Sequence, residues 1–314
     1  MKVQKIKSAF MIIIVSIITL QSFASGMNNA TWYVSIDVDR LQNNEIYQLI
    51  HDKELQTSNI KSDGLSNIPK EISHITFYGD AKGSKDATAV IRGDFSNFSL
   101  NEHLLNILYE HEETSKIFQE SELNYKKHHI KVLKVTEFHQ GDEDEIKNVF
   151  LSKVNNELSV ISFNVNEVEK WLDSEYTDTS VTKDRLLSVE VDVATALAHM
   201  GMNLEENSHL MHSEIFKKVL QVSASITEEN DDMAIDIALT TSDDATAIQI
   251  EQVINGLVAM KNLSTSDDDN ELQEAFIKNL LIERNNNNIL ITTYASVGDV
   301  KKTILSKNYN SDNQ

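Results

Sequence analysis

Residues 163–172 read FNVNEVEKWL, and residues 295–304 read ASVGDVKKTI. The two stretches match position by position: Val165 with Val297, Glu167 with Asp299, Val168 with Val300, Lys170 with Lys302 and Leu172 with Ile304. Apolar residues at this spacing predict a short amphipathic helix in each stretch. Each helix would directly follow a strand, ELSVISFN (157–164) or NILITTYAS (288–296). The repeated strand and helix predict that one folding unit occurs twice in the chain.

The rest of the chain supports the same repeat. Alternating apolar and polar residues predict a strand in VSIDVD (34–39) and another in LSVEVD (187–192). Further predicted elements are a hairpin (72–96), a helix (99–110) and strands (125–135 and 148–154) in the first half, and a hairpin (218–242) and helices (242–263 and 267–283) in the second. We therefore predict an α+β fold of two similar antiparallel-sheet-plus-helix halves in tandem, as repeats of the ferredoxin-like type.

The N-terminus has the parts of a secretory signal peptide. Lys2, Lys5 and Lys7 form a basic head, an apolar run follows at 8–20, and small residues precede a cleavage site after Ala24. The apolar run is too short to span a bilayer comfortably. The predicted divisions are a signal peptide (1–24), a first half (25–173), a linker (174–184), a second half (185–308) and a disordered tail (309–314). We expect a periplasmic or secreted protein.

Several segments resemble a group of uncharacterised secreted or periplasmic bacterial proteins. The likeness lies in ATAVIRGDFS (87–96), YKKHHIKVL (125–133), VFLSKVNNELSVIS (149–162) and most of the second half, from Val222 to Met260. It covers most of the chain after the signal peptide. The resemblance implies an α+β fold with two similar halves, and it implies no activity.

Composition limits the range of partners. The chain of 314 residues has a formal net charge of −21 and contains no cysteine. An acidic chain is a poor binder of nucleic acid and is repelled by anionic lipid. We therefore predict no nucleic-acid partner and no stable membrane insertion after signal cleavage. Without disulfides, stability depends on buried apolar surface.

One short stretch is rich in possible metal ligands. AHMGMNLEENSHLMHSE (198–214) contains His199, His209 and His212 together with several methionines. Imidazole and thioether groups suit copper, and imidazole also suits zinc, so the three histidines are the candidate metal ligands. The alternative is a pair of ordinary helices in which methionine fills the core and histidine faces solvent. The apolar spacing favours that alternative.

Acidic residues form a second candidate site. Asp37 and Asp39 lie at the end of the first predicted strand, and Glu190 and Asp192 occupy the matching places in 187–192. Paired carboxylates can perform acid–base catalysis. Alternation alone also places polar residues at these positions, so a solvated sheet face is the simpler interpretation.

Signatures of common enzymes are missing from the sequence. It has no Gly-x-Ser-x-Gly nucleophile motif and no glycine-rich phosphate loop. His128 and His129 are neighbours on a predicted strand and point to opposite faces, so they are poorly placed to share an ion. We expect an exported protein without cofactor that acts as a non-catalytic binding module of the cell envelope, for another envelope protein or a small ligand. The alternatives are a periplasmic copper- or zinc-binding protein using the 199–212 cluster, and a hydrolase with an unrecognised carboxylate site.

Overall fold

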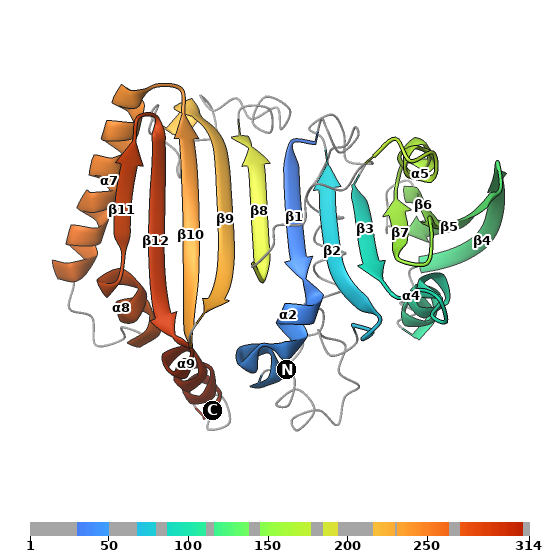
Figure 1. Ribbon diagram of the computed structural model, residues 1–314, viewed down its shortest axis with the longest axis horizontal. Coiled ribbons are helices and arrows are strands. Elements are labelled where there is room, and N and C mark those ends of the chain that lie inside the picture. The colour runs from blue at the N-terminus through green and yellow to red at the C-terminus, as the bar shows by residue number, and fades with distance from the viewer. Residues whose placement is uncertain are drawn as a thin grey trace. The chain divides into compact units, whose positions relative to one another are not determined.

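The computed structural model describes residues 30–49, 68–79, 87–110, 116–137, 145–176, 185–193, 216–229, 231–263 and 271–309 (Figure 1). The chain divides into two compact units. Unit 1 contains the described residues up to Asp39 and those between 62 and 181, and unit 2 contains the others. Both units combine an antiparallel sheet with helices, so the predicted α+β class is confirmed. The predicted signal peptide (1–24) lies outside the described residues.

The described strands of unit 1 form a sheet in the order β1-β2-β3-β7-β6-β5-β4, with every neighbouring pair antiparallel. They are β1 (Trp32–Asp37), β2 (Ile72–Gly79), β3 (Thr88–Gly93), β4 (Lys116–Tyr125), β5 (His128–Glu137), β6 (Glu145–Lys153) and β7 (Leu158–Ser162). Helix α4 (Leu100–Glu110) follows β3, and α5 (Val165–Leu172) follows β7.

Helices pack on both faces of this sheet. On one face, α5 places Val168 and Trp171 against Val160 of β7. On the other face, α4 places Leu104 against Leu133 of β5. The faces are opposite because side chains alternate along each strand. Two apolar helix faces therefore hold one sheet between them.

The β4–β5 hairpin differs from the sequence prediction, which treated 125–135 as a single strand. Residues 116–125 form β4, and Tyr125 pairs with His128 across a two-residue turn. Lys126 in that turn has a φ of 53°, in the left-handed region that glycine usually occupies. The prediction was wrong because Lys126 and Lys127 give no sequence signal for a turn.

The described strands of unit 2 form a sheet in the order β11-β12-β10-β9-β8, again with every neighbouring pair antiparallel. They are β8 (Leu187–Asp192), β9 (Val219–Glu229), β10 (Asp232–Thr241), β11 (Leu281–Asn285) and β12 (Asn288–Ser296). The helices are α7 (Asp244–Leu263), α8 (Glu271–Lys278) and α9 (Val297–Tyr309), with a short 3-10 helix at Phe216–Lys218. The helix predicted at 267–283 is too long: it ends at Lys278, because Leu281–Asn285 pairs with β12 as β11.

Apolar side chains of α7, α8 and α9 pack on one face of the unit 2 sheet. Ile250 of α7 lies against Ile289, and Phe276 of α8 lies near Ala295. Residues 40–49 also belong to unit 2, although they follow β1 in the sequence. They include the end of helix α2 (Val38–Asn43), and Ile46 just beyond it packs against the Ala295 cluster. Within the described part of the chain, no helix is long and apolar enough to cross a membrane.

The two matching sequence stretches, 163–172 and 295–304, each contain the start of a helix. Helix α5 begins at Val165 and α9 begins at the matching Val297. Side chains of the preceding residues cap them: Asn164 accepts a hydrogen bond from the Asn166 N–H at 3.0 Å, and Ser296 accepts one at the same distance from the helix's third residue. Neighbouring strands are antiparallel in each unit, as the prediction of antiparallel sheets requires. The described strands of unit 2 do not form the split βαβ unit of the ferredoxin-like type, because β8 pairs directly with β9 and no strand lies between them. Duplication of an ancestral unit stays a prediction.

Candidate functional site

An open hollow of about 360 Å³ is the strongest candidate for a binding site in unit 1. We call it the basic hollow. It is lined by Asn101, Glu122, Lys127, His128, His129, Lys131, Lys153, Val154 and Asn155. Three lysines and two histidines accompany one carboxylate, on a chain whose net charge is −21. The hollow is thus a local concentration of basic groups on an acidic protein.

The register of three strands brings the basic side chains together. Glu122 of β4 stands directly opposite Lys131 of β5, and His129 shares that face because it lies two residues away. Lys131 in turn pairs with Leu151 of β6, which places Lys153 on the same face. The floor of the hollow is therefore a rigid antiparallel sheet.

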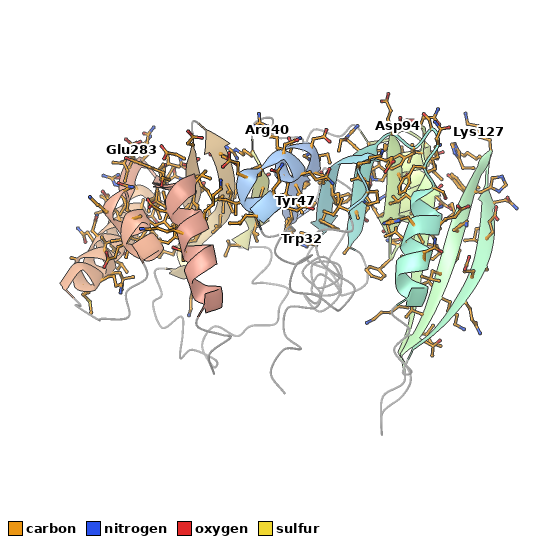
Figure 2. The ribbon with its side chains drawn as sticks, turned by 90° about the horizontal axis from the view of Figure 1, so that it is seen from below. Trp32, Arg40, Tyr47, Asp94, Lys127 and Glu283 are labelled. Carbon is orange, nitrogen blue, oxygen red and sulfur yellow. The ribbon has the colours of Figure 1, made fainter. Side chains whose placement is uncertain are left out.

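The two adjacent lysines in the turn between β4 and β5 have different surroundings. Lys126 donates to Asp173 at 2.5 Å, and the Tyr125 hydroxyl donates to the other oxygen of that carboxylate at 2.8 Å. These two donors hold the pKa of Asp173 below its usual value. Lys127 lies at the tip of the hairpin and lines the hollow instead (Figure 2).

The adjacent histidines occupy different environments, as the sequence predicted. His129 Nδ1 lies 2.5 Å from a Glu122 carboxylate oxygen on the face that forms the floor. His128 is paired with Tyr125, on the face where α5 packs. Both side chains nevertheless line the hollow, because His128 is the first residue of β5 and lies directly beside the β4–β5 turn. The expectation that they point to opposite faces is confirmed by the register.

The remaining cations differ in how firmly they are held. Lys153 donates to the Phe95 carbonyl at 2.6 Å, which anchors it at the end of β6. Within the described part of the chain, neither Lys127 nor Lys131 forms an ion pair. Asn101 lies in the first turn of α4, where the helix dipole adds partial positive charge. Two lysine ammonium groups are therefore open to an anion from solvent.

The lining determines which chemistry the hollow supports. Pockets for apolar ligands are lined mainly by hydrophobic and aromatic side chains, whereas Val154 is the one aliphatic residue among the described lining residues. Ammonium, imidazole and amide groups donate hydrogen bonds to carboxylates and phosphates. The described lining includes no hydroxyl or thiol nucleophile. Its ammonium, imidazole and amide groups suit holding an anion.

The metal ligands predicted from the sequence, His199, His209 and His212, lie outside the described residues. Elsewhere, in the part of the chain that the structure describes, no three His, Cys, Asp or Glu side chains are grouped to hold a metal ion. The 199–212 hypothesis therefore stays a prediction.

A titration tests the metal hypothesis. If the cluster binds copper or zinc, a metal concentration 100-fold above Kd stabilises the native protein by about 2.7 kcal/mol and raises its melting temperature. Replacing His199, His209 and His212 by alanine removes that shift, whereas the control His128→Ala/His129→Ala keeps it. A melting temperature of the wild-type protein that does not respond to either metal contradicts the hypothesis.

The carboxylates predicted on the first strand are not arranged as expected. β1 ends at Asp37, and Asp39 lies in the first turn of α2, so the strand prediction for 34–39 was wrong at its end. Asp37 is paired across the sheet with His74, and the Ser35 hydroxyl lies 2.7 Å from His74 Nε2. Although these residue types occur in hydrolases, Ser35 and His74 are both buried, and a substrate cannot contact them in this arrangement. Glu190 is exposed on β8, which forms as predicted.

Sequence reasoning missed the basic hollow. The run YKKHHIK (125–131) is unusually basic for this chain, and that composition was the available signal. Lys153 joins the lining of the hollow only through the pairing of β5 with β6, and no local sequence pattern predicts that pairing.

Comparisons with known proteins give only a weak structural likeness. Neither a family model nor a curated protein matches the chain. Among solved structures, crystal form III of TP0453 is similar, with a TM-score of 0.43 and 10% sequence identity over 90% of this chain and 96% of that chain. Crystal form I of TP0453 gives a TM-score of 0.39 and 10% identity over 88% of this chain and 94% of that chain. Likeness at this level assigns neither a family nor an activity to the chain.

Proposed function

We propose that this chain is an exported, non-catalytic binding protein of the cell envelope that holds a negatively charged ligand in the basic hollow. One observation carries the proposal: the hollow gathers Lys127, Lys131 and Lys153 on a chain whose net charge is −21. An acidic protein has no general need for such a concentration of like charges, which repel one another. A bound anion removes that repulsion.

The exposure of the site sets the expected affinity. Ion pairs in contact with water contribute about 1 kcal/mol or less each. Four such contacts to one ligand amount to about 4 kcal/mol, which corresponds to a Kd near 1 mM. A ligand with several charged oxygens is therefore required, and salt is expected to weaken its binding.

Replacing the two unpaired lysines tests the proposal. We expect Lys127→Gln/Lys131→Gln to raise the Kd for inorganic pyrophosphate about 30-fold, because two charged contacts of about 1 kcal/mol each are lost. Isothermal titration calorimetry at low ionic strength measures this change. The matched control is Lys134→Gln, since Lys134 lies on the same strand as Lys131 but on the opposite face. Equal weakening by the control, or no pyrophosphate binding by the wild-type protein, contradicts the proposal.

Export is tested separately from binding. When the full chain is expressed in a bacterium with an outer membrane, we expect the mature protein to begin at Ser25, because a small residue at Ala24 fits the signal peptidase site. N-terminal sequencing of the periplasmic fraction and of the medium checks this and distinguishes the two locations. Ala24→Arg is expected to leave the signal attached. An unprocessed wild-type chain in the cytoplasm contradicts export.

A further inference from the structure

The sheet of unit 2 has one face without helices among the described residues, and its composition is unusual. Helices α7, α8 and α9 pack against the face that carries Ile289 and Ala295. The alternate residues of β12 face the other way, as do their partners on neighbouring strands. We name this surface the outer sheet face. Its charged and large apolar members, among the side chains that the structure describes, are Glu190, Asp192, Asp232, Asp236, Leu281, Glu283, Leu290 and Tyr294.

The register fixes which residues belong to the outer sheet face. Thr292 of β12 is paired with Asp236 on one side and with Leu281 on the other. Its hydroxyl donates to the Asp236 carboxylate at 2.8 Å, so these side chains lie on the same face. Ser223 of β9 pairs with Glu190 of β8 on one side and with Ala238 of β10 on the other. Ala238 lies on the same face as Asp236, two residues before it, so Glu190 lies on that face too.

The charges of the outer sheet face have a single sign. Among the residues whose side chains the structure describes, it carries five carboxylates, and Arg284 is the one basic residue in the strands β8 to β12. Arg284 pairs with Ile289 and so points to the helical face, where it donates to Glu251 at 2.9 Å and to Asp244 at 2.5 Å. No lysine or arginine from these strands offsets the acidic face.

Apolar side chains stand within this acidic surface. Leu281, Leu290 and Tyr294 are 54%, 40% and 45% exposed. Leu281 is opposite Thr292, while Leu290 and Tyr294 flank Thr292 on its own strand, so the three surround one position. Exposed apolar residues rimmed by polar ones are typical of interaction sites.

We propose that the outer sheet face docks a folded protein whose surface places lysine and arginine around a small apolar patch. Charge complementarity selects a basic partner, and the apolar trio requires a surface that can bury it. Nucleic acid and anionic lipid would be repelled by the carboxylates. Across β8 to β12 the face is about 19 Å wide and on average about 27 Å long, which gives about 500 Å² and a small, transient interface. The proposal is independent of the basic hollow.

Zero-length crosslinking of the full chain to cytochrome c, a small basic protein, tests this assignment. A carbodiimide joins carboxylates to lysines in contact, and mass spectrometry locates the joined residues. We expect crosslinks at Glu190, Asp236 and Glu283 to be at least fivefold more frequent than at Glu274, an exposed carboxylate on α8. An even distribution over exposed carboxylates overturns the proposal.

Charge-reversal variants provide a quantitative second test with the same probe. At low salt, Glu190→Lys/Asp236→Lys/Glu283→Lys is expected to weaken cytochrome c binding at least tenfold, because attraction becomes repulsion at the interface. The control Glu157→Lys/Glu175→Lys/Glu274→Lys changes the net charge equally and is expected to weaken binding about twofold. Equal weakening by the two sets overturns the proposal. The variant Leu281→Ser/Tyr294→Ser leaves the net charge unchanged and is expected to weaken cytochrome c binding about threefold. An unchanged affinity contradicts the proposal that the partner buries these apolar side chains.

Discussion

Replacing Gly93 by alanine is expected to lower the free energy of unfolding by about 3 kcal/mol, at the upper end of the usual cost of overpacking. A Cβ at this position would lie 1.9 Å from the backbone carbonyl oxygen of Glu71. The backbone is fixed on both sides of the contact: the Gly93 N–H donates to the Glu157 carbonyl at 3.1 Å, and the Asp94 N–H donates to the Glu71 carbonyl at 2.8 Å. The added methyl group therefore separates β2 from β3 and breaks hydrogen bonds.

The same substitution at Gly256 is the matched control. Gly256 lies within α7, and an added Cβ there meets nothing within 4 Å. Alanine in a helix interior is favoured over glycine, so Gly256→Ala is expected to raise the free energy of unfolding by about 1 kcal/mol. Urea denaturation followed by circular dichroism measures both variants. A Gly93→Ala protein as stable as the wild type contradicts the described packing of β2 against β3.

Replacing Glu167 by alanine is expected to lower the free energy of unfolding by about 3 kcal/mol, because it breaks a buried ion pair with its hydrogen bonds. The Glu167 side chain is 1% exposed and accepts a hydrogen bond from Lys170 at 2.8 Å. Its other oxygen accepts longer hydrogen bonds from the hydroxyls of Tyr78 and Tyr176. The carboxylate thus joins α5 to β2 and to the segment after the helix.

The surroundings of Glu167 explain the size of this effect. Burial raises the pKa of Tyr78, whose hydroxyl also accepts a hydrogen bond from Trp171 Nε1 at 2.9 Å. The hydrogen bond to Glu167 raises the pKa of Lys170, so the lysine stays protonated. Glu169, two positions along α5, is half-buried and provides the control. Glu169→Ala is expected to change stability by about 0.5 kcal/mol or less, and thermal or urea unfolding that finds the two variants alike contradicts the network's role.

Matched sequence positions have diverged between the two units. Asp299, which corresponds to Glu167, lies at the exposed start of α9 and accepts a hydrogen bond from the Ser296 hydroxyl at 2.8 Å. Glu167 instead turns into the core of unit 1. The β4–β5 hairpin, which provides most of the basic hollow, has no counterpart among the described strands of unit 2. Under the duplication hypothesis, the proposed ligand binding would therefore be a property of the first half.

Periodicity predicted the elements in which one side of the backbone is buried. The strands of residues 187–192 and 288–296 and the starts of α5 and α9 follow from local alternation and spacing. β4 and β11 were missed because their sequences, KIFQESELNY and LIERN, lack a clean alternation. Their strand conformation is stabilised by pairing with β5 and β12.

The candidate site was less predictable than the fold. The alternation that places Asp37 on β1 also implied Asp39, but the chain turns into α2 at Val38 and separates them. The basic hollow combines α4, a hairpin turn and the ends of three strands, so its members are distant in sequence. The basic composition of 125–131 was an available signal that the sequence prediction did not use, and only the register adds Lys153 to that run.

The central claim is that the basic hollow binds an anion, and an NMR titration tests it most directly. Addition of inorganic pyrophosphate to the ¹⁵N-labelled protein is expected to shift the amide signals of residues 101, 127–131 and 153–155, with saturation and with weaker binding at high salt. Signals around Lys278, an exposed lysine of α8, are expected to stay in place. Shifts distributed over lysines throughout the chain, or an absence of saturable shifts around the hollow, would contradict the account.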